Sequence, residues 1–132
     1  MISGTEAIAH SLKKNDVYTA GFVGYPVTDL IEESDADVVP NEKVGMEKAI
    51  GRSFAGERGC LIAKHVGVNV ALDPLASSAT FGTGGGVLVI AGDDPGAVKS
   101  QDAGDSRSLG FKARVPVLTP SGVDGLLDSV EE

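Results

Sequence analysis

The chain has 132 residues, of which 42% are hydrophobic and 23% charged, and its formal net charge is -8. These proportions are typical of a folded globular protein, and the acidic balance excludes a surface built to bind nucleic-acid phosphates. The single cysteine, Cys60, excludes an internal disulfide and a cysteine-ligated metal or iron–sulfur site within the chain. The sequence has no signal-like N-terminal region and no apolar run of membrane-spanning length, which predicts a soluble cytoplasmic domain.

Predicted helices and strands alternate along the first half of the chain. Ser3 and Glu6 have the spacing of a capping box, and the apolar residues after them predict a helix that ends near Lys14. The elements expected next are a strand over 17–23, a short helix over 27–33, a short strand over 37–39, a helix over about 42–55 and a strand over 59–63.

The alternation continues in the second half. Asp73 and Pro74 resemble an N-cap and a first-turn proline, which predicts a helix that ends near Phe81. The sequence leaves open whether 67–72 is already helical. The elements expected next are a turn at 82–86, a strand over 87–91, a polar loop over 92–104, a short helix over 105–112, a last strand over 115–118 and an amphipathic helix that carries Val123, Leu126, Leu127 and Val130.

The strands at 59–63 and 87–91 are continuous apolar runs, GCLIA and VLVIA. Such runs are typical of parallel strands that helices cover on both faces. The sequence therefore predicts a single three-layer α/β/α domain over residues 1–132, with a mainly parallel sheet.

The loops that follow the predicted strands are rich in glycine, proline and isolated polar residues. They are GYPVT at 24–28, PNE at 40–42, KHVGVN at 64–69 and GDDPGAVKSQDAGDSR at 92–107. In a parallel sheet the carboxyl ends of all strands lie at one edge, where open α/β sheets bind ligands. We therefore expect a functional site where these four loops converge.

Each candidate residue in these loops also has a structural interpretation. Glu42 opens a helix, where a carboxylate complements the helix dipole whether or not it has a chemical role. Thr28 and Asp29 could cap the second helix, His65 could make a structural hydrogen bond instead of a ligand contact, and Arg107 could be a surface salt-bridge residue.

Two further sets of polar residues, Asp93 with Asp94 and His10, are not predicted to belong to a functional site. Adjacent Asp93 and Asp94 project to opposite sides of an extended chain, which favours a solvated turn over a metal site, and no metal site is predicted. His10, on the first helix, is expected at the surface.

Four segments carry a family resemblance: GYPVT, PNEKVGMEKAIG, KHVGVNVALDPL and GGVLVIAGDDPGAVKSQDAGDSR. In this order and spacing they resemble the thiamine-diphosphate pyrimidine-binding (Pyr) domain of 2-oxoacid:ferredoxin oxidoreductases, and especially the α subunit of indolepyruvate ferredoxin oxidoreductase. The resemblance runs from GTEAIA to VPVLTPS, which is nearly the whole chain. It implies the Pyr fold and a role in oxidative decarboxylation of a 2-oxoacid.

The resemblance implies that Glu42 is the catalytic residue, because the matching glutamate in the family faces the aminopyrimidine of the cofactor. A carboxyl group that hydrogen-bonds to the pyrimidine ring nitrogen favours the imino tautomer, whose nitrogen can take the proton from the thiazolium carbon. Glutamine could keep the shape but could not relay the proton. The other residues expected to contact the cofactor are Tyr25, Pro26, His65, Gly67 and Asn69.

The substrate contacts implied by the resemblance come from three residues. Thr28 matches a threonine that contacts the 2-oxoacid in related pyruvate-using enzymes, and Lys64 lines the site. Arg107 lies where an arginine is expected to hold the substrate carboxylate, a task that suits a planar guanidinium. Asp29 stands where the ferredoxin-linked relatives usually have proline.

The family also holds the cofactor diphosphate and Mg²⁺ through a Gly-Asp-Gly motif and a downstream asparagine. The nearest stretches here, GDD at 92–94 and GDS at 104–106, do not match that motif. The resemblance therefore implies half of an active site, completed by a diphosphate-binding partner subunit, with Mg²⁺ and iron–sulfur clusters only on partner chains and ferredoxin or an iron–sulfur subunit as electron acceptor. Two alternatives stay open: the α subunit of a non-oxidative sulfopyruvate- or phosphonopyruvate-type decarboxylase, and a non-catalytic Pyr-fold assembly module.

Overall fold

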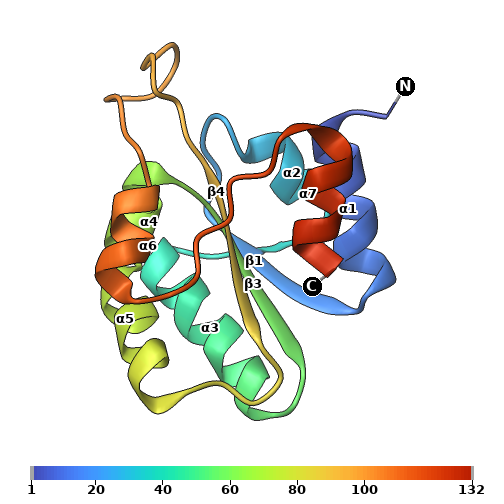
Figure 1. Ribbon diagram of the computed structural model, residues 1–132, viewed down its shortest axis with the longest axis vertical. Coiled ribbons are helices and arrows are strands. Elements are labelled where there is room, and N and C mark those ends of the chain that lie inside the picture. Colours follow the sequence, from blue (N-terminus) through green and yellow to red (C-terminus); the bar gives the residue numbers. More distant parts are fainter. Residues whose placement is uncertain (1, 132) are drawn as a thin grey trace.

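The computed structural model describes residues 2–131 and has three layers, a parallel sheet with helices on both faces (Figure 1). The strands are β1 (Val17–Gly21), β2 (Asp37–Val38), β3 (Arg58–Lys64) and β4 (Val87–Gly92). The helices are α1 (Gly4–Lys14), α2 (Thr28–Glu33), α3 (Glu42–Phe54), α4 (His65–Val70), α5 (Leu72–Phe81), α6 (Arg107–Ala113) and α7 (Gly122–Glu131).

The strand order in the sheet is β2-β1-β3-β4, and every neighbouring pair is parallel. Figure 1 shows α1, α2 and α7 on one side of the sheet and α3, α4, α5 and α6 on the other. The predicted three-layer fold with a parallel sheet is thereby confirmed. All four strands direct their carboxyl ends to the same edge of the sheet, and the register places Lys64 beside Gly92 at that edge.

The centre of the sheet, β3, accounts for the continuous apolar run in the sequence. Cys60 and Ile62 belong to the core on the α1 and α2 side, whereas Leu61 and Ala63 belong to the core on the α3, α4 and α5 side. All four side chains are fully buried. Burial also raises the pKa of the Cys60 thiol to about 12, so this cysteine is a core residue, as its apolar surroundings predicted.

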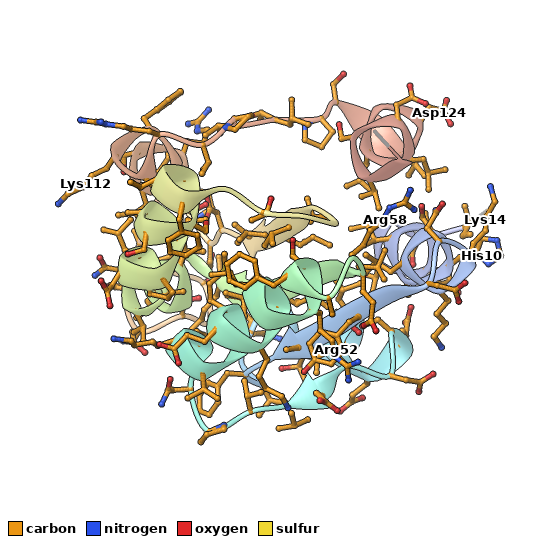
Figure 2. All side chains as sticks on the ribbon, turned by 90° about the horizontal axis from the view of Figure 1, so that it is seen from below. His10, Lys14, Arg52, Arg58, Lys112 and Asp124 are labelled. Carbon is orange, nitrogen blue, oxygen red and sulfur yellow. The ribbon has the colours of Figure 1, made fainter. Side chains whose placement is uncertain are left out.

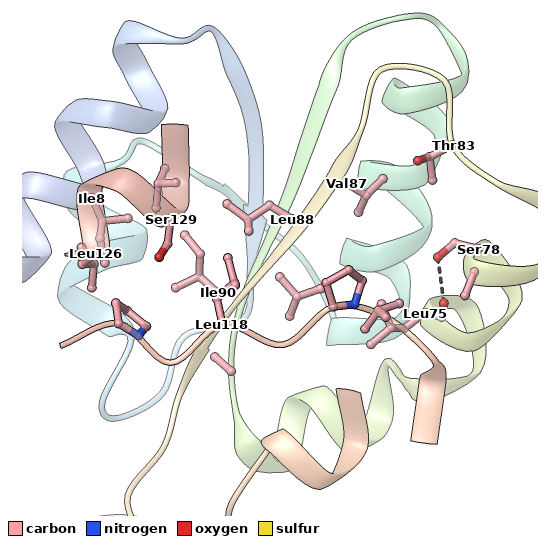
Figure 3. Close-up of a pocket in the computed structure, with 17 residues that line it drawn as sticks. Ile8, Leu75, Ser78, Thr83, Val87, Leu88, Ile90, Leu118, Leu126 and Ser129 are labelled. Carbon is pink, nitrogen blue, oxygen red and sulfur yellow. Dashed lines mark hydrogen bonds between the residues drawn. The ribbon is translucent and has the colours of Figure 1, made fainter. Parts of the chain in front are cut away.

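The predicted strand over 115–118 is wrong: this segment has no regular secondary structure. Pro116 has no N–H to donate to a neighbouring strand, which disfavours pairing with β4. A cavity of about 630 Å³ separates the two, lined by Leu88 and Ile90 of β4, by Leu118 and by Leu126 of α7 (Figure 3). The side chains of β4 are consequently only partly buried, and not covered on both faces as expected.

Most other elements lie within a few residues of their predicted ranges. The capping box is confirmed, because the Glu6 N–H donates to Ser3 Oγ at 3.1 Å and the Ser3 N–H donates to Glu6 Oε2 at 2.7 Å. Asp73 does not cap α5: the helix begins one residue earlier, and Asp73 and Pro74 lie in its first turn. His10 is exposed on the outer side of α1, as predicted (Figure 2).

At the carboxyl edge of the sheet, two element boundaries differ from the predicted ones. β1 ends at Gly21, so 22–27 forms the connection to α2. β3 leads directly into α4, so His65 opens a helix and does not lie in a loop. Among residues 2–131, no helix is both long and apolar enough to cross a membrane.

Candidate functional site

The four segments that the sequence placed at one edge of the sheet do lie there. They are the connection 22–27 after β1, the turn 39–41 after β2, the start of α4 after β3 and the loop 93–106 after β4 (Figure 1). The loop after β4 projects beyond the body of the domain at this edge. The edge therefore gathers polar side chains from segments far apart in the chain.

Glu42 is the first residue of α3 and is 7% exposed. The helix is capped by its neighbour, since Asn41 Oδ1 accepts a hydrogen bond from the Val44 N–H at 3.0 Å. Within the described part of the chain, no side chain hydrogen-bonds or pairs with the Glu42 carboxyl group. Helix geometry thus explains where Glu42 lies, but it does not explain why a largely buried residue carries a carboxyl group that no described residue pairs with.

Gly67 of α4 lies flat against the Glu42 side chain. A Cβ atom at position 67 would lie 2.6 Å from Glu42 Cγ and 2.7 Å from Cδ, and it would overlap Oε1. Any larger side chain would therefore displace the carboxyl group. Gly67 is therefore a structural requirement of the Glu42 position.

The connection after β1 packs against the end of β4. A Cβ atom on Gly92 would lie 2.5 Å from Val27 Cγ1 and 3.0 Å from Pro26 Cγ, and the Tyr25–Pro26 peptide bond is cis. Thr28 is the first residue of α2 and is partly buried. The N-cap residue of α2 is Val27, and no side chain caps the helix. The predicted structural role of Thr28 as a helix cap is therefore wrong.

Two polar residues mark the junction of β3 with α4. Lys64 is partly buried, and its Nζ donates to Gln101 Oε1 at 3.5 Å. His65 is 6% exposed, and its Nε2 lies 2.9 Å from Asp102 Oδ1. A carboxylate can only accept, so Nε2 carries the hydrogen of this bond, and Nδ1 is an acceptor whenever the ring is neutral. His65 therefore makes the structural hydrogen bond that was one of its two interpretations, and its second nitrogen is left over.

The two adjacent aspartates after β4 organise the loop. Asp94 is buried, and its carboxylate accepts hydrogen bonds from the N–H groups of Val98, Lys99 and Ser100, each at 3.1 Å. These backbone donors, that of Lys99 first, lower the pKa of Asp94. Asp93 Oδ2 accepts from the Ser106 N–H at 3.0 Å. The expected solvated turn is thus wrong, because both carboxylates hold backbone N–H groups.

Arg107 opens α6 and is paired with Asp105. Its Nη2 donates to Asp105 Oδ2 at 2.6 Å, and its Nε donates to Oδ1 at 2.8 Å. This bidentate pair lowers the pKa of Asp105 to about 2 and raises that of Arg107. Both side chains are more than half exposed, so the guanidinium remains accessible to an anion from solvent.

A cavity of about 380 Å³ lies beside Arg107, between α4, the start of α6 and the segment 115–120. Asp93 and Ser106 also line it. Among the predicted site residues within 2–131, Arg107 alone lines this cavity; Glu42 and Thr28 do not. Asn69 is exposed on α4 and makes no side-chain hydrogen bond within the described residues. The structure therefore packs Gly67 against Glu42, and it places Arg107 on a cavity that Glu42 does not line.

Asp102 is the residue that the sequence analysis missed. Its spacing from His65 along the chain carries no periodic signal, and only the return of the loop after β4 brings the two together.

Over residues 2–131 no three histidine, cysteine, aspartate or glutamate side chains are grouped as metal ligands.

The fold and the edge site define a class: a parallel three-layer α/β domain of the Pyr type, with a buried glutamate at the carboxyl edge of its sheet. No protein-family model matches the chain.

Similarity to individual proteins is extensive. The chain is 39% identical over 140 residues to indolepyruvate oxidoreductase subunit IorA of Archaeoglobus fulgidus and 33% identical over 141 residues to that of Pyrococcus abyssi, which covers 95% and 99% of this chain. The IorA of Methanothermobacter marburgensis is 40% identical over 88 residues. In the first two comparisons the chain spans 22% of the relative. The family resemblance predicted from the sequence is confirmed.

Proposed function

We propose that the chain is the Pyr-domain part of a thiamine-diphosphate-dependent 2-oxoacid:ferredoxin oxidoreductase. The observation that carries the proposal is Glu42, a residue only 7% exposed whose carboxyl group has no partner in the described chain, at the ligand-binding edge of the sheet. In a non-catalytic assembly module this carboxyl group would have no role, since no described residue pairs with it. The relatives are named as oxidoreductase subunits, which favours an oxidative reaction over a non-oxidative decarboxylase.

The residues around Glu42 fit the aminopyrimidine half of thiamine diphosphate. Glu42 would hold a proton at the pyrimidine ring nitrogen through its carboxyl group, and Gly67 keeps that carboxyl group in place. Tyr25, Pro26 and His65 would line the ring on the neighbouring segments, and Asn69 would contact it from α4. When bound, the cofactor supplies the carbon nucleophile that attacks the 2-oxoacid.

Three residues are assigned to the substrate. Thr28 presents a hydroxyl group at the start of α2, and Lys64 presents an ammonium group at the end of β3. Arg107 would hold the substrate carboxylate, which would have to compete with Asp105 for the same guanidinium donors. A 2-oxoacid fits this set because it carries one carboxylate and one polarised carbonyl group.

The remaining parts of the reaction are assigned to partner chains. A diphosphate-binding subunit would contribute the Mg²⁺ and diphosphate half of the site, and iron–sulfur clusters would lie on partner chains, since Cys60 is the single cysteine here and is buried in the core. Ferredoxin or an iron–sulfur subunit would accept the electrons. We place the complex in the cytoplasm.

The test is reconstitution of the chain with the diphosphate-binding partner, thiamine diphosphate, Mg²⁺ and a 2-oxoacid, followed by measurement of decarboxylation and of electron transfer. We expect Glu42→Gln to lower the rate by about 10²- to 10⁴-fold, the usual contribution of a positioned acid–base group. The matched control is Glu47→Gln, which makes the same change at an exposed position of the same helix and should leave the rate unchanged. Equal rates for Glu42→Gln and the wild type would refute the role of Glu42.

A further inference from the structure

Four consecutive residues of the loop after β4 reach back to side chains of the candidate site. The contacts are Lys99 Nζ at 5.4 Å from the centre of the Tyr25 ring, the Ser100 hydroxyl donating to the Tyr25 carbonyl oxygen at 3.5 Å, Lys64 Nζ donating to Gln101 Oε1 at 3.5 Å, and His65 Nε2 at 2.9 Å from Asp102 Oδ1. The loop thus contacts three residues that the sequence assigned to cofactor and substrate, and of these His65 is buried beneath it.

Firm hydrogen bonds hold both ends of this loop. Asp94, at the start, accepts the N–H groups of residues 98–100 within the loop, and Asp93 accepts the Ser106 N–H at the end, so residues 93 and 106 are joined directly. The intervening residues 95–105 form a compact excursion with a fixed base, which is the geometry of a loop that can move as a unit. They leave the sheet beyond the last paired residue of β4, Gly92.

His65 is sealed beneath the returning arm of the loop. Gly104 lies flat against the imidazole, since a Cβ atom there would lie 2.6 Å from His65 Cγ and 2.8 Å from Nε2. Nδ1 of His65 is buried and has no hydrogen-bond partner, and the same holds for Oδ1 of Asp93, at the base of the loop. His65 and Asp93 each follow directly on the last paired residues of β3 and β4, Lys64 and Gly92. The closed loop therefore leaves one buried polar atom unpaired on His65 and one on Asp93, an arrangement that a folded protein tolerates poorly.

The contacts that hold the loop closed differ in strength. Two are 3.5 Å long, and the contact of Lys99 with Tyr25 is a cation–π contact at a partly exposed ring. The hydrogen bond from His65 to Asp102, at 2.9 Å, is the shortest contact between the loop and the site residues, so it is the main clasp between them.

We propose that residues 95–105 form a lid, clasped shut by His65 and Asp102, which lifts to present His65 Nδ1 to an N–H or O–H group of the ligand. Lifting gives the buried Nδ1 of His65 access to a partner and frees Tyr25 and Lys64 from their contacts with the loop. The lid itself rests on contacts within the chain; the identity of the ligand rests on the proposed function.

Hydrogen–deuterium exchange of the full 132-residue chain tests the clasp without any partner. Asp102→Ala removes the acceptor, and we expect exchange in residues 95–105 to become about fivefold faster while β3 and α4 keep their protection. Gly104→Ala should give the same result by a second route, because its Cβ would overlap the His65 ring. Asp35→Ala, which breaks the exposed ion pair with Lys13, is the matched control and should change nothing in the lid. Unchanged lid exchange in both Asp102→Ala and Gly104→Ala would overturn the proposal.

A cleavable thiol crosslink tests whether the lid must lift. The double variant Lys64→Cys/Gln101→Cys is joined by a short crosslinker with a central disulfide, and the native Cys60 does not compete because it is fully buried. In the complex with the diphosphate-binding partner, we expect thiamine diphosphate to bind at least tenfold more weakly to the locked form than to the same protein after cleavage. Equal binding before and after cleavage would overturn the lid.

The two experiments separate the two proposals. If the wild-type complex does not bind thiamine diphosphate or decarboxylate any 2-oxoacid, the proposed function fails, whereas the exchange result still decides whether the lid exists. If the complex is active and the locked form binds as well as the cleaved form, the lid fails and the proposed function stands.

Discussion

Substitution of Gly67 by alanine tests whether Gly67 holds the Glu42 carboxyl group in its catalytic position. The added Cβ atom would lie 2.6 Å from Glu42 Cγ and 2.7 Å from Cδ. Carbon atoms in ordinary contact lie about 3.5 to 4.0 Å apart, so the Glu42 side chain must move by roughly 1 Å. Glu42 has no hydrogen-bond partner in the described residues to resist this movement, and it is therefore the group expected to give way.

The expected effect on stability is small because two contributions oppose each other. Overpacking of a buried site costs about 1–3 kcal/mol, whereas replacement of glycine by alanine within a helix returns about 1 kcal/mol. The net change in the free energy of unfolding is thus a loss of about 0–2 kcal/mol. A carboxyl group displaced by roughly 1 Å, by contrast, is expected to lower the catalytic rate by about 10²-fold.

The assay combines chemical denaturation of the chain with decarboxylation by the reconstituted complex. Gly51→Ala is the matched control: it lies in α3, and a Cβ atom there meets nothing within 4 Å. This control should raise the free energy of unfolding by up to about 1 kcal/mol and leave the rate unchanged. A rate for Gly67→Ala within twofold of the wild type would refute the claim that Gly67 positions Glu42.

Two further predictions concern ionisable groups. Arg107→Gln should raise the pKa of Asp105 from about 2 towards the ordinary aspartate value, as followed by NMR titration of the carboxyl group. Because the pKa of Asp105 is depressed in the folded chain, the pair with Arg107 should stabilise the fold above the ordinary aspartate pKa. That contribution should be lost as the pH falls towards 2. An unchanged Asp105 titration in Arg107→Gln would contradict the pairing. Cys60 should not react with a thiol reagent at neutral pH in the native chain and should react fully after denaturation, because burial raises its pKa to about 12; rapid native labelling would contradict its place in the core.

The parts of the fold that follow from local chemistry could be predicted from the sequence. The capping box at Ser3 and Glu6 and the apolar run of β3 identified their elements, because the spacing of these residues is itself the physical signal. The strand expected over 115–118 was wrong because an apolar run alone does not supply a partner strand, and Pro116 lacks the N–H that pairing with β4 would use.

The sequence also determined one part of the candidate site, and the tertiary structure decided the rest. That Glu42 follows a strand, and that its segment meets three others at one edge, was determined by the sequence, because parallel strands share the direction of their carboxyl ends. The contact of Gly67 with Glu42 and that of Asp102 with His65 were decided only by the tertiary structure. Each joins elements separated by many residues, and no local spacing encodes how closely two packed elements approach.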